Sequence, residues 1–305
     1  MAEKIDGVLF AGRAKTPEPL AAFLHAAAHL QSCGVKVALH SDIAKLCAGF
    51  GMDTKQLPVR DIKKPGCEAG KPVCEGDISD AGGIGLVVVL GGDGTFLSAA
   101  REFAPLGAML AGVNIGYLGF LTDIAREGMA ESIGNITGGD YFVEERAMLD
   151  VQVGDTAFSP AVNDMVVSRG EGGFLMDMRL DINKRFAFNV RADGLIVSTP
   201  SGSTAYALSA GGPVVAPDVN TLLLVPLCPH ALTHRPLVVS ADYVLDITML
   251  KTPQDATVHL DGRDRTAAAA GDVIRIRRHK TPLRICHPLS YDYYDTLRRK
   301  LHWGA

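Results

Sequence analysis

The chain of 305 residues lacks several features that would each point to a particular class of protein. Its six cysteines include no Cys-x-x-Cys pair and have no histidine at zinc-finger spacing, so neither a protein-bound metal nor a disulfide framework is predicted. Its longest apolar runs, such as 86–90 and 222–226, are far shorter than the roughly 20 residues of a membrane-spanning helix. The first six residues carry acids where a secretion signal would not. We therefore expect a cytoplasmic protein that is not bound to a membrane.

The charges of the chain are nearly balanced. Lysine and arginine number 30 against 34 aspartates and glutamates, which leaves a formal net charge of −4. This balance gives no overall attraction to nucleic acid, and none is expected as a partner, so any anionic ligand must be bound by a local cluster of groups. The length predicts about two domains, and the 47% of hydrophobic residues is enough for two cores.

In the first half, apolar strand-like runs alternate with helical stretches. Strands are predicted at 8–10, 35–39, 85–90 and 108–113, and helices at 17–33, 41–46, 96–103 and 126–136. The run 85–90 is apolar throughout, which is typical of a strand buried on both faces of a parallel sheet. The stretch 53–83, rich in Lys, Pro, Gly and Asp, predicts a loop. The fold class expected here is a Rossmann-like α/β domain.

A glycine-rich turn, Gly91-Gly92-Asp93-Gly94-Thr95, follows the strand 85–90 directly. Such a turn, leading from a parallel strand into a helix, is where open α/β sheets bind ligands, because main-chain N–H groups and the helix dipole converge there. The sequence is neither Gly-x-Gly-x-x-Gly nor a P-loop. An acid among phosphates is unfavourable unless it binds a cation, accepts a proton or accepts a hydrogen bond from a hydroxyl. Asp93 is therefore a candidate catalytic residue, and the alternative is that it only turns the chain and caps the helix.

The second half has strand-like alternation with turn signals between the runs. Strands are expected within 141–153, 156–168, 175–182, 186–190, 222–225, 237–239, 244–248, 257–260, 273–277 and 283–286. This pattern predicts an all-β, sandwich-like domain beginning near Gly139, followed by a helix within 291–303. The predicted organisation is an α/β domain over 1–138, a β-sandwich over 139–288 and a C-terminal helix, 289–305, that returns to the first domain.

Three segments of the second half carry groups suited to ligand binding. Asn163-Asp164 places an amide beside a carboxylate within an apolar run. The segment 191–213 is dense in hydroxyls and glycines, which suits hydrogen bonding to a sugar or base. The charged turn 259–264 is by itself more typical of a hairpin loop.

Taken together and in order, these segments resemble the NAD kinase family. The resemblance is carried by 91–95, Asn163-Asp164, the run 193–206 ending in Thr204-Ala205-Tyr206, Cys228-Pro229-His230 with Arg235-Pro236, and Asp261-Gly262. It implies an N-terminal α/β domain, a C-terminal β-sandwich and a homodimer or homotetramer. It also implies transfer of the γ-phosphoryl group of ATP to the adenosine-ribose 2′-hydroxyl of NAD, with Mg²⁺ or another divalent cation accompanying ATP.

The resemblance also implies roles for individual residues. Asp93 would accept the proton of the attacking hydroxyl, while Gly91, Gly92, Gly94 and Thr95 would contact phosphates. The residues expected to bind the dinucleotide are Asn163, Asp164, Arg191, Asp193, Thr204, Ala205, Tyr206, Ser209 and Arg263. Two positions depart from the family: Asp164 stands where glutamate is usual, and Arg263 stands where glutamine is common.

Two other readings of these residues stay open. The glycine-aspartate turn is shared with lipid and sugar kinases, and a protein that senses NAD without turnover could keep the same pocket. The density of hydroxyls in 191–213 argues against a lipid acceptor. The acid at Asp93 argues against a pure binding protein, which has no need of a carboxylate among phosphates. Polyphosphate in place of ATP, and NADH in place of NAD, are further alternatives.

Overall fold

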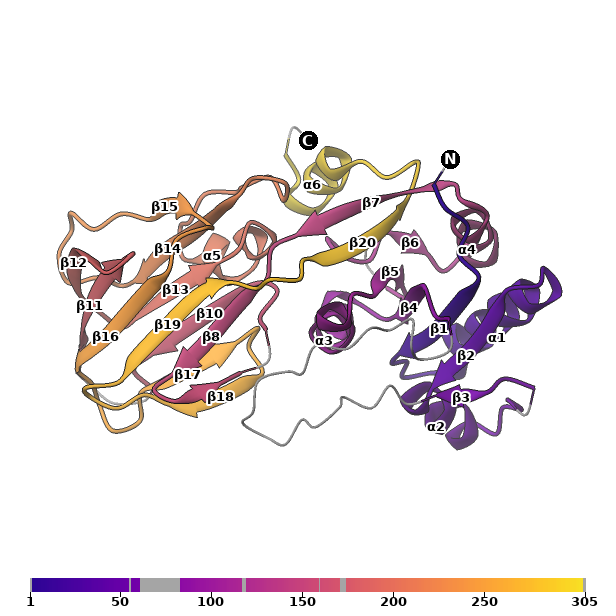
Figure 1. Cartoon of the computed structure of the whole chain (residues 1–305), viewed down its shortest axis with the longest axis horizontal. Coiled ribbons are helices and arrows are strands. Elements are labelled where there is room, and N and C mark those ends of the chain that lie inside the picture. The colour runs from indigo at the N-terminus through magenta and orange to yellow at the C-terminus, as the bar shows by residue number, and fades with distance from the viewer. Residues whose placement is uncertain are drawn as a thin grey trace. The chain divides into compact units, whose positions relative to one another are not determined.

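The computed structural model describes residues 2–54, 56–60, 83–116, 119–158, 160–170 and 174–303. The described residues form two compact units (Figure 1). The first unit contains those up to 145 and from 283 onward, and the second contains 146–282. The central part of the loop predicted at 53–83, namely 61–82, lies outside the described residues. Within the described ranges, no helix is long and apolar enough to cross a membrane.

The first unit is built on one eight-stranded sheet with the order β3-β2-β1-β4-β5-β20-β7 and with β6 beside β5. The strands are β1 (Gly7–Gly12), β2 (Lys36–His40), β3 (Val59–Arg60), β4 (Leu86–Leu90), β5 (Met109–Asn114), β6 (Ile124–Ala125), β7 (Tyr141–Arg146) and β20 (Leu283–Pro288). The helices are α1 (Pro17–Ser32), α2 (Ser41–Gly49), α3 (Asp93–Phe103), the short 3₁₀ helix η2 (Ala104–Leu106), α4 (Met129–Gly138) and α6 (Tyr293–Leu301).

Local sequence signals explain the elements that carry the site. Helix α1 begins with Pro17, buries Leu20, Phe23 and Leu30, and is followed by Gly34 in the left-handed region at φ 84°. All five residues of β4 are buried, because helices cover both faces of the parallel sheet. Residues of α1 and α4 share one core cluster with β1 and β4, and α3 contacts the same two strands. The predicted parallel α/β fold is confirmed.

The strand order reverses between β1 and β4, so the chain leaves these neighbouring strands in opposite directions across the sheet. Strands β1, β2, β4 and β5 are parallel, and their carboxyl ends therefore lie at one edge. A reversal of this kind opens a crevice at the carboxyl edge of the sheet. The glycine turn 91–95 follows β4 at this place.

The second unit consists of two six-stranded antiparallel sheets, β15-β14-β13-β10-β17-β18 and β12-β11-β16-β19-β8-β9. The strands are β8 (Leu149–Val153), β9 (Thr156–Ala157), β10 (Asp164–Ser168), β11 (Met176–Ile182), β12 (Arg185–Ala192), β13 (Gly194–Ser198), β14 (Thr221–Leu227), β15 (Leu237–Ser240), β16 (Leu245–Lys251), β17 (Thr257–Leu260), β18 (Asp264–Ala267) and β19 (Val273–Arg278). One core cluster takes residues from both sheets, including Met165, Val197, Met178 and Ile247. This is the predicted sandwich.

The outer face of the first sandwich sheet is covered by a short helical segment. Val166, Ile196 and Leu223 form a small buried cluster there with Ala207. Ala207 belongs to α5 (Tyr206–Ser209), which follows the 3₁₀ helix η3 (Ser201–Thr204). This helical segment places the end of the hydroxyl-rich run 191–213 against the sheet.

The units divide at positions other than the predicted 138/139 and 288/289 boundaries. Strands β7 and β20 lie in the sheet of the first unit, so the chain passes between the units at 145/146 and at 282/283. The predicted run 141–153 is two strands in different sheets, and the run 156–168 is likewise split into β9 and β10. The alternation of apolar and polar residues along a strand does not reveal which sheet the strand joins.

Candidate functional site

The glycine turn after β4 has one position that only glycine can occupy. Gly91 has φ 152°, and a Cβ atom there would lie 2.6 Å from the Cβ of Thr95. Its N–H donates to the carbonyl of Val113 on the neighbouring strand at 2.9 Å. Gly92 is the N-cap of α3 and is exposed. The turn therefore holds the start of α3 close to β5 and leaves main-chain groups accessible at its outer side.

A cleft of about 850 Å³ opens beside this turn. It lies at the carboxyl edge of the sheet, where the loops after β1, β4 and β5 meet the first turn of α2. Its lining includes Arg13, Lys15 and Lys45 together with Gly91, Gly92 and Thr95. Asp42 also lines the cleft, with Oδ1 3.9 Å from the Lys45 ammonium, so the three cations outnumber one carboxylate. Positive charge beside a helix N-terminus and exposed main-chain groups suits an anion such as a phosphate chain.

The Asp93 carboxylate does not line this cleft and does not act as the helix cap. One oxygen, Oδ2, accepts the N–H of Phe120 at 2.9 Å. The other, Oδ1, accepts the N–H of Leu121 at 3.0 Å and the hydroxyl of Thr122 at 3.3 Å. Since two carboxylate oxygens offer about four acceptor positions, one position on Oδ2 is left for a further donor.

The loop that receives Asp93 lies between β5 and β6 and fits closely around the carboxylate. A Cβ atom at Gly119 would collide with Oδ1 of Asp93. The Asn114 side-chain amide donates to the Thr122 hydroxyl at 3.1 Å. The Asp93 carboxylate is therefore fixed in orientation by its neighbours.

In the second unit, Asn163 and Asp164 are held by a carboxylate from a distant hairpin. Asp261, at the turn between β17 and β18, accepts the main-chain N–H groups of Val162, Asn163 and Asp164 at 2.9, 2.7 and 3.1 Å. It has φ 49°, a left-handed conformation that aspartate tolerates in turns. The charged turn 259–264 is thus a structural support for the Asn163-Asp164 pair.

Much of the hydroxyl-rich segment also supports that pair. The Thr199 hydroxyl donates to the carbonyl of Val162 at 2.6 Å, and the Thr199 N–H donates to that of Asn163 at 2.9 Å. A Cβ atom at Gly202 would collide with the Asn163 carbonyl. Ser203 bonds both main-chain groups of Val215. These hydroxyls and glycines therefore pack the chain closely around Asn163 rather than facing a ligand.

A pocket of about 440 Å³ brings together several of the predicted dinucleotide-binding residues. Asn163, Asp164, Ala205 and Tyr206 line it, and so does His259. The pocket lies on the outer face of the sheet, and Tyr206 is 49% exposed beside it. An apolar wall with an amide, a carboxyl group and an exposed aromatic ring suits a nucleoside.

Burial gives Asp164 an unusual protonation equilibrium. The residue is 5% exposed, and burial, with the nearby Asp261 carboxylate as the second cause, raises its pKa to about 7. The three main-chain N–H groups that donate to Asp261 favour the charged form of its carboxylate. Of the two carboxyl groups, Asp164 is therefore the one that holds a proton. Near neutral pH, Asp164 can therefore donate a hydrogen bond as well as accept one.

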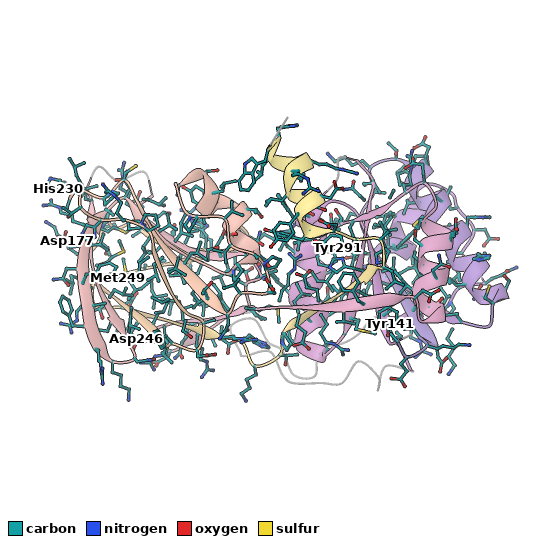
Figure 2. The ribbon with its side chains drawn as sticks, turned by 90° about the horizontal axis from the view of Figure 1, so that it is seen from above. Tyr141, Asp177, His230, Asp246, Met249 and Tyr291 are labelled. Carbon is teal, nitrogen blue, oxygen red and sulfur yellow. The ribbon has the colours of Figure 1, made fainter. Side chains whose placement is uncertain are left out.

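Several other predicted residues do not line the two cavities described so far. Asp193 forms an ion pair with Arg169 at 2.6 Å, and Arg191 pairs with Asp177 at 3.5 Å. Arg191 lines a separate hollow of about 510 Å³ with Asp177 and His230, the last two labelled in Figure 2. Three more residues, which lie near the 440 Å³ pocket in sequence, are not among its lining residues: Thr204, Ser209 and Arg263. Gly94 and Asp93 are likewise absent from the lining of the 850 Å³ cleft.

The chain is similar to known proteins along most of its length. Models of the ATP-NAD kinase N-terminal and C-terminal domains match residues 10–141 and 162–287. The NAD kinase of Thiobacillus denitrificans is 49% identical over 222 residues, which are 72% of this chain and 76% of that protein. The chain belongs to the ATP-NAD kinase family. The NAD kinase of Aromatoleum aromaticum is 40% identical across 100% of this chain and 96% of its own length.

The family assignment confirms the resemblance found in the sequence. The protein is a phosphotransferase with an alcohol group as acceptor, and the lipid- and sugar-kinase alternatives lose their support. Two solved structures share the fold at 22% sequence identity. Yeast NADH kinase complexed with NADH has a TM-score of 0.81 over 99% of this chain and 89% of its own. An NAD kinase from Archaeoglobus fulgidus in complex with ATP has a TM-score of 0.69 over 97% of this chain and 98% of its own.

Four residues of this ATP-NAD kinase family member were not predicted from sequence although they line its cavities. Arg13 directly follows β1, and a cation at the carboxyl end of a parallel strand is a signal that could have been used. Lys15, two residues later, belongs to the same loop. Lys45 on α2 and His259 on β17 reach their cavities only through the fold. Burial lowers the pKa of His259, and its Nε2 lies 2.9 Å from the Thr257 hydroxyl.

Replacing Asp164 by asparagine should change how stability depends on pH. The pKa of Asp164 is near 7 when folded and near 3.8 when unfolded, so the folded state binds the extra proton between these values. Stability should therefore fall as pH rises from about 4 to about 7. Asp164→Asn should remove this slope, raising Tm relative to wild type at pH 8 but little at pH 5. Thermal melts at both pH values, with the exposed Asp155→Asn as control, test this; equal shifts at both would contradict it.

Proposed function

We propose that this protein transfers the γ-phosphoryl group of ATP to the adenosine-ribose 2′-hydroxyl of NAD, giving NADP and ADP. The hydroxyl oxygen forms the new bond to phosphorus, the bond between the γ-phosphorus and the bridging oxygen breaks, and the hydroxyl proton passes to a carboxylate. The observation that carries the proposal is that the cationic cleft and the fixed Asp93 carboxylate both lie at the glycine turn 91–95. Such transfer depends mainly on positioning and on charge neutralisation.

The cleft of the first unit is the proposed site for the ATP phosphates. Arg13, Lys15 and Lys45 supply positive charge, and Gly91 and Gly92 allow phosphate oxygens to approach the main chain at the start of α3. The chain as a whole is slightly acidic, with a net charge of −4, so these three cations are a local feature. Local cations are what a polyanionic substrate requires.

The pocket of the second unit is the proposed site for the NAD nucleoside. The Asn163 amide can form hydrogen bonds with a base or a ribose, and Asp164 can form one with a ribose hydroxyl in either protonation state. Tyr206 offers a partly exposed ring for contact with the base or the nicotinamide. Arg191, Asp193, Thr204, Ser209 and Arg263 stay proposed contacts that rest on the family resemblance.

Asp93 is the proposed proton acceptor. Its carboxylate is held by two main-chain N–H groups and one hydroxyl, and one acceptor position on Oδ2 is left for the ribose hydroxyl. A fixed carboxylate orients that hydroxyl and takes its proton during transfer. The same hydrogen bonds also give Asp93 a structural role, which any test of catalysis must separate.

We also propose that Mg²⁺ or a similar cation enters with ATP. Among the described residues, no three His, Cys, Asp or Glu side chains converge as a metal site, so phosphate oxygens and water would provide most of its ligands. When bound, the cation neutralises charge that develops on the phosphates.

Assembly as a homodimer or homotetramer in the cytoplasm is part of the same proposal. Leu237 and Val238, exposed on the edge strand β15, support self-association.

The direct test is an assay of the purified protein with NAD, ATP and Mg²⁺. We expect formation of NADP and ADP in equal amounts and complete loss of activity with EDTA. An NADP-specific dehydrogenase measures the product without interference from NAD. Binding of NAD with no NADP formed would instead identify a sensing protein, and ADP release only with a lipid or sugar acceptor would overturn the proposal.

Removal of a cleft cation should weaken ATP binding in particular. Lys45→Met should raise KM for ATP roughly tenfold and leave KM for NAD and the turnover number within about twofold, since a peripheral cation contributes mostly to uniform binding. Lys36→Met is the matched control, because Lys36 is exposed at the opposite, amino end of β2. Steady-state kinetics with each substrate varied would detect the difference. Equal KM values for ATP in both variants would place the phosphates elsewhere.

A further inference from the structure

His287, in β20, lies between two carboxylates and is not used by the proposed reaction. Its Nδ1 is 3.0 Å from Oδ2 of Asp123, and its Nε2 is 3.0 Å from Oε2 of Glu144. Its side chain is completely buried, and those of Asp123 and Glu144 are only 6% and 16% exposed. The Tyr291 ring, labelled in Figure 2, stacks on the imidazole at 3.9 Å.

With Asp123 and Glu144 both ionised, the two 3.0 Å contacts are hydrogen bonds when both ring nitrogens of His287 donate. A neutral imidazole has one N–H and could satisfy only one of the two carboxylates, whereas an imidazolium satisfies both. Asp123 depends strongly on this bond, because its other oxygen, Oδ1, is buried and has no hydrogen-bond partner among the described residues. A buried carboxylate that loses its donor is strongly disfavoured. His287 is therefore a firm anchor for Asp123.

Asp123 is the next residue after the three that hold the Asp93 carboxylate. Phe120, Leu121 and Thr122 donate to Asp93, and Asp123 accepts from His287. Residues 120–122 are thus attached to α3 through Asp93, and Asp123 attaches the same stretch of the loop to β20 through His287. Glu144 on β7 holds the far side of the imidazole. The order of contacts is Asp93, loop 120–122, Asp123, His287, Glu144.

We propose that His287 is a positioning residue for phosphoryl transfer. Its imidazolium fixes Asp123, and through Asp123 it fixes the loop whose N–H groups orient the Asp93 carboxylate. This inference rests on the proposed role of Asp93. A 1 Å displacement of a catalytic group can lower a rate about 100-fold, so loss of the anchor should reduce turnover although His287 touches no substrate.

The two contacts of His287 can be separated by substitution. The asparagine amide nitrogen is as many bonds from the main chain as Nδ1, so His287→Asn retains a donor toward Asp123. The glutamine amide nitrogen corresponds in the same way to Nε2, so His287→Gln retains a donor toward Glu144. A merely structural histidine would leave the two variants equally active in their folded fractions, whatever their stabilities. Our proposal predicts that they differ in activity.

We expect His287→Asn to keep the turnover number within about threefold of wild type and His287→Gln to lower it about tenfold or more, with KM for NAD and ATP little changed in both. Hydrogen exchange should show faster exchange of the Phe120 and Leu121 amides in His287→Gln than in His287→Asn. The control is His279→Asn in the second unit, where a half-buried histidine pairs with Asp150 at 3.7 Å; it should lower Tm without these effects.

Equal turnover and equal exchange in the two His287 variants would overturn the proposal. If neither variant folds, Asp123→Asn and Glu144→Gln provide the same comparison, with faster exchange and slower turnover expected only for Asp123→Asn; equal effects would again overturn it. Because amide exchange needs no substrate, it reports on the anchor even if the wild-type protein forms no NADP, an outcome that would contradict only the proposed function.

Discussion

Asp93→Asn is expected to lower the turnover number for NADP formation about 100-fold or more, while NAD binding stays within roughly tenfold of wild type. Asparagine has nearly the same shape as aspartate but has no basic oxygen to accept the ribose proton. Turnover measured by NADP formation and NAD binding measured by calorimetry on one preparation would test both parts.

The same substitution should also destabilise the protein, because both carboxylate oxygens accept hydrogen bonds. The amide group of asparagine would face either the Phe120 N–H or the Leu121 N–H, and two donors cannot pair. Thr122→Val separates this structural cost from catalysis, since it removes the 3.3 Å hydroxyl bond to Asp93 and keeps the carboxylate. We expect it to lower Tm but to retain turnover within about tenfold. Asp93→Asn with a low Tm and normal turnover in the folded fraction would remove Asp93 from the mechanism.

The parallel α/β fold could be predicted because its signals are local. An apolar run buried throughout, as in β4, and a helix with Pro17 at its start and Gly34 after its end are determined by residues adjacent in sequence. The glycine turn 91–95 could be placed for the same reason. What the local pattern could not provide is the position of β7 and β20 in the first sheet, since β20 pairs with β5 across more than half of the chain.

The sequence could name candidate residues for the site, but it could not provide the contacts that hold them. Asp93 finds its hydrogen-bond partners 27 to 29 residues away, and Asp261 finds its partners 97 to 99 residues away. No spacing in the sequence encodes such pairs. This is why the hydroxyls of 191–213 were expected to face a ligand, whereas Thr199 and Ser203 support the chain around Asn163 and Asp164.

The two neighbouring glycines of the turn should respond to alanine in different ways. Gly91→Ala would place a methyl group 2.6 Å from the Cβ of Thr95, at φ 152°. The Thr95 Cβ is fixed by the backbone of α3, so the turn itself must shift. Strain and overpacking together should cost about 3 kcal/mol and lower Tm by several degrees. The measurement is thermal melting, and a variant as stable as wild type would show that the turn can relax.

Gly92→Ala should instead change ATP binding and leave stability nearly unchanged. No atom lies within 4 Å of a Cβ at Gly92, so stability should change by no more than about 1 kcal/mol, the cost of a poorer N-cap. The new methyl group would instead enter the 850 Å³ cleft, where phosphate oxygens are proposed to approach the main chain. We expect KM for ATP to rise about tenfold or more, with KM for NAD nearly unchanged. An unchanged KM for ATP in a stable Gly92→Ala protein would mean that the phosphates do not contact this turn, and the cations of the cleft would then need another ligand.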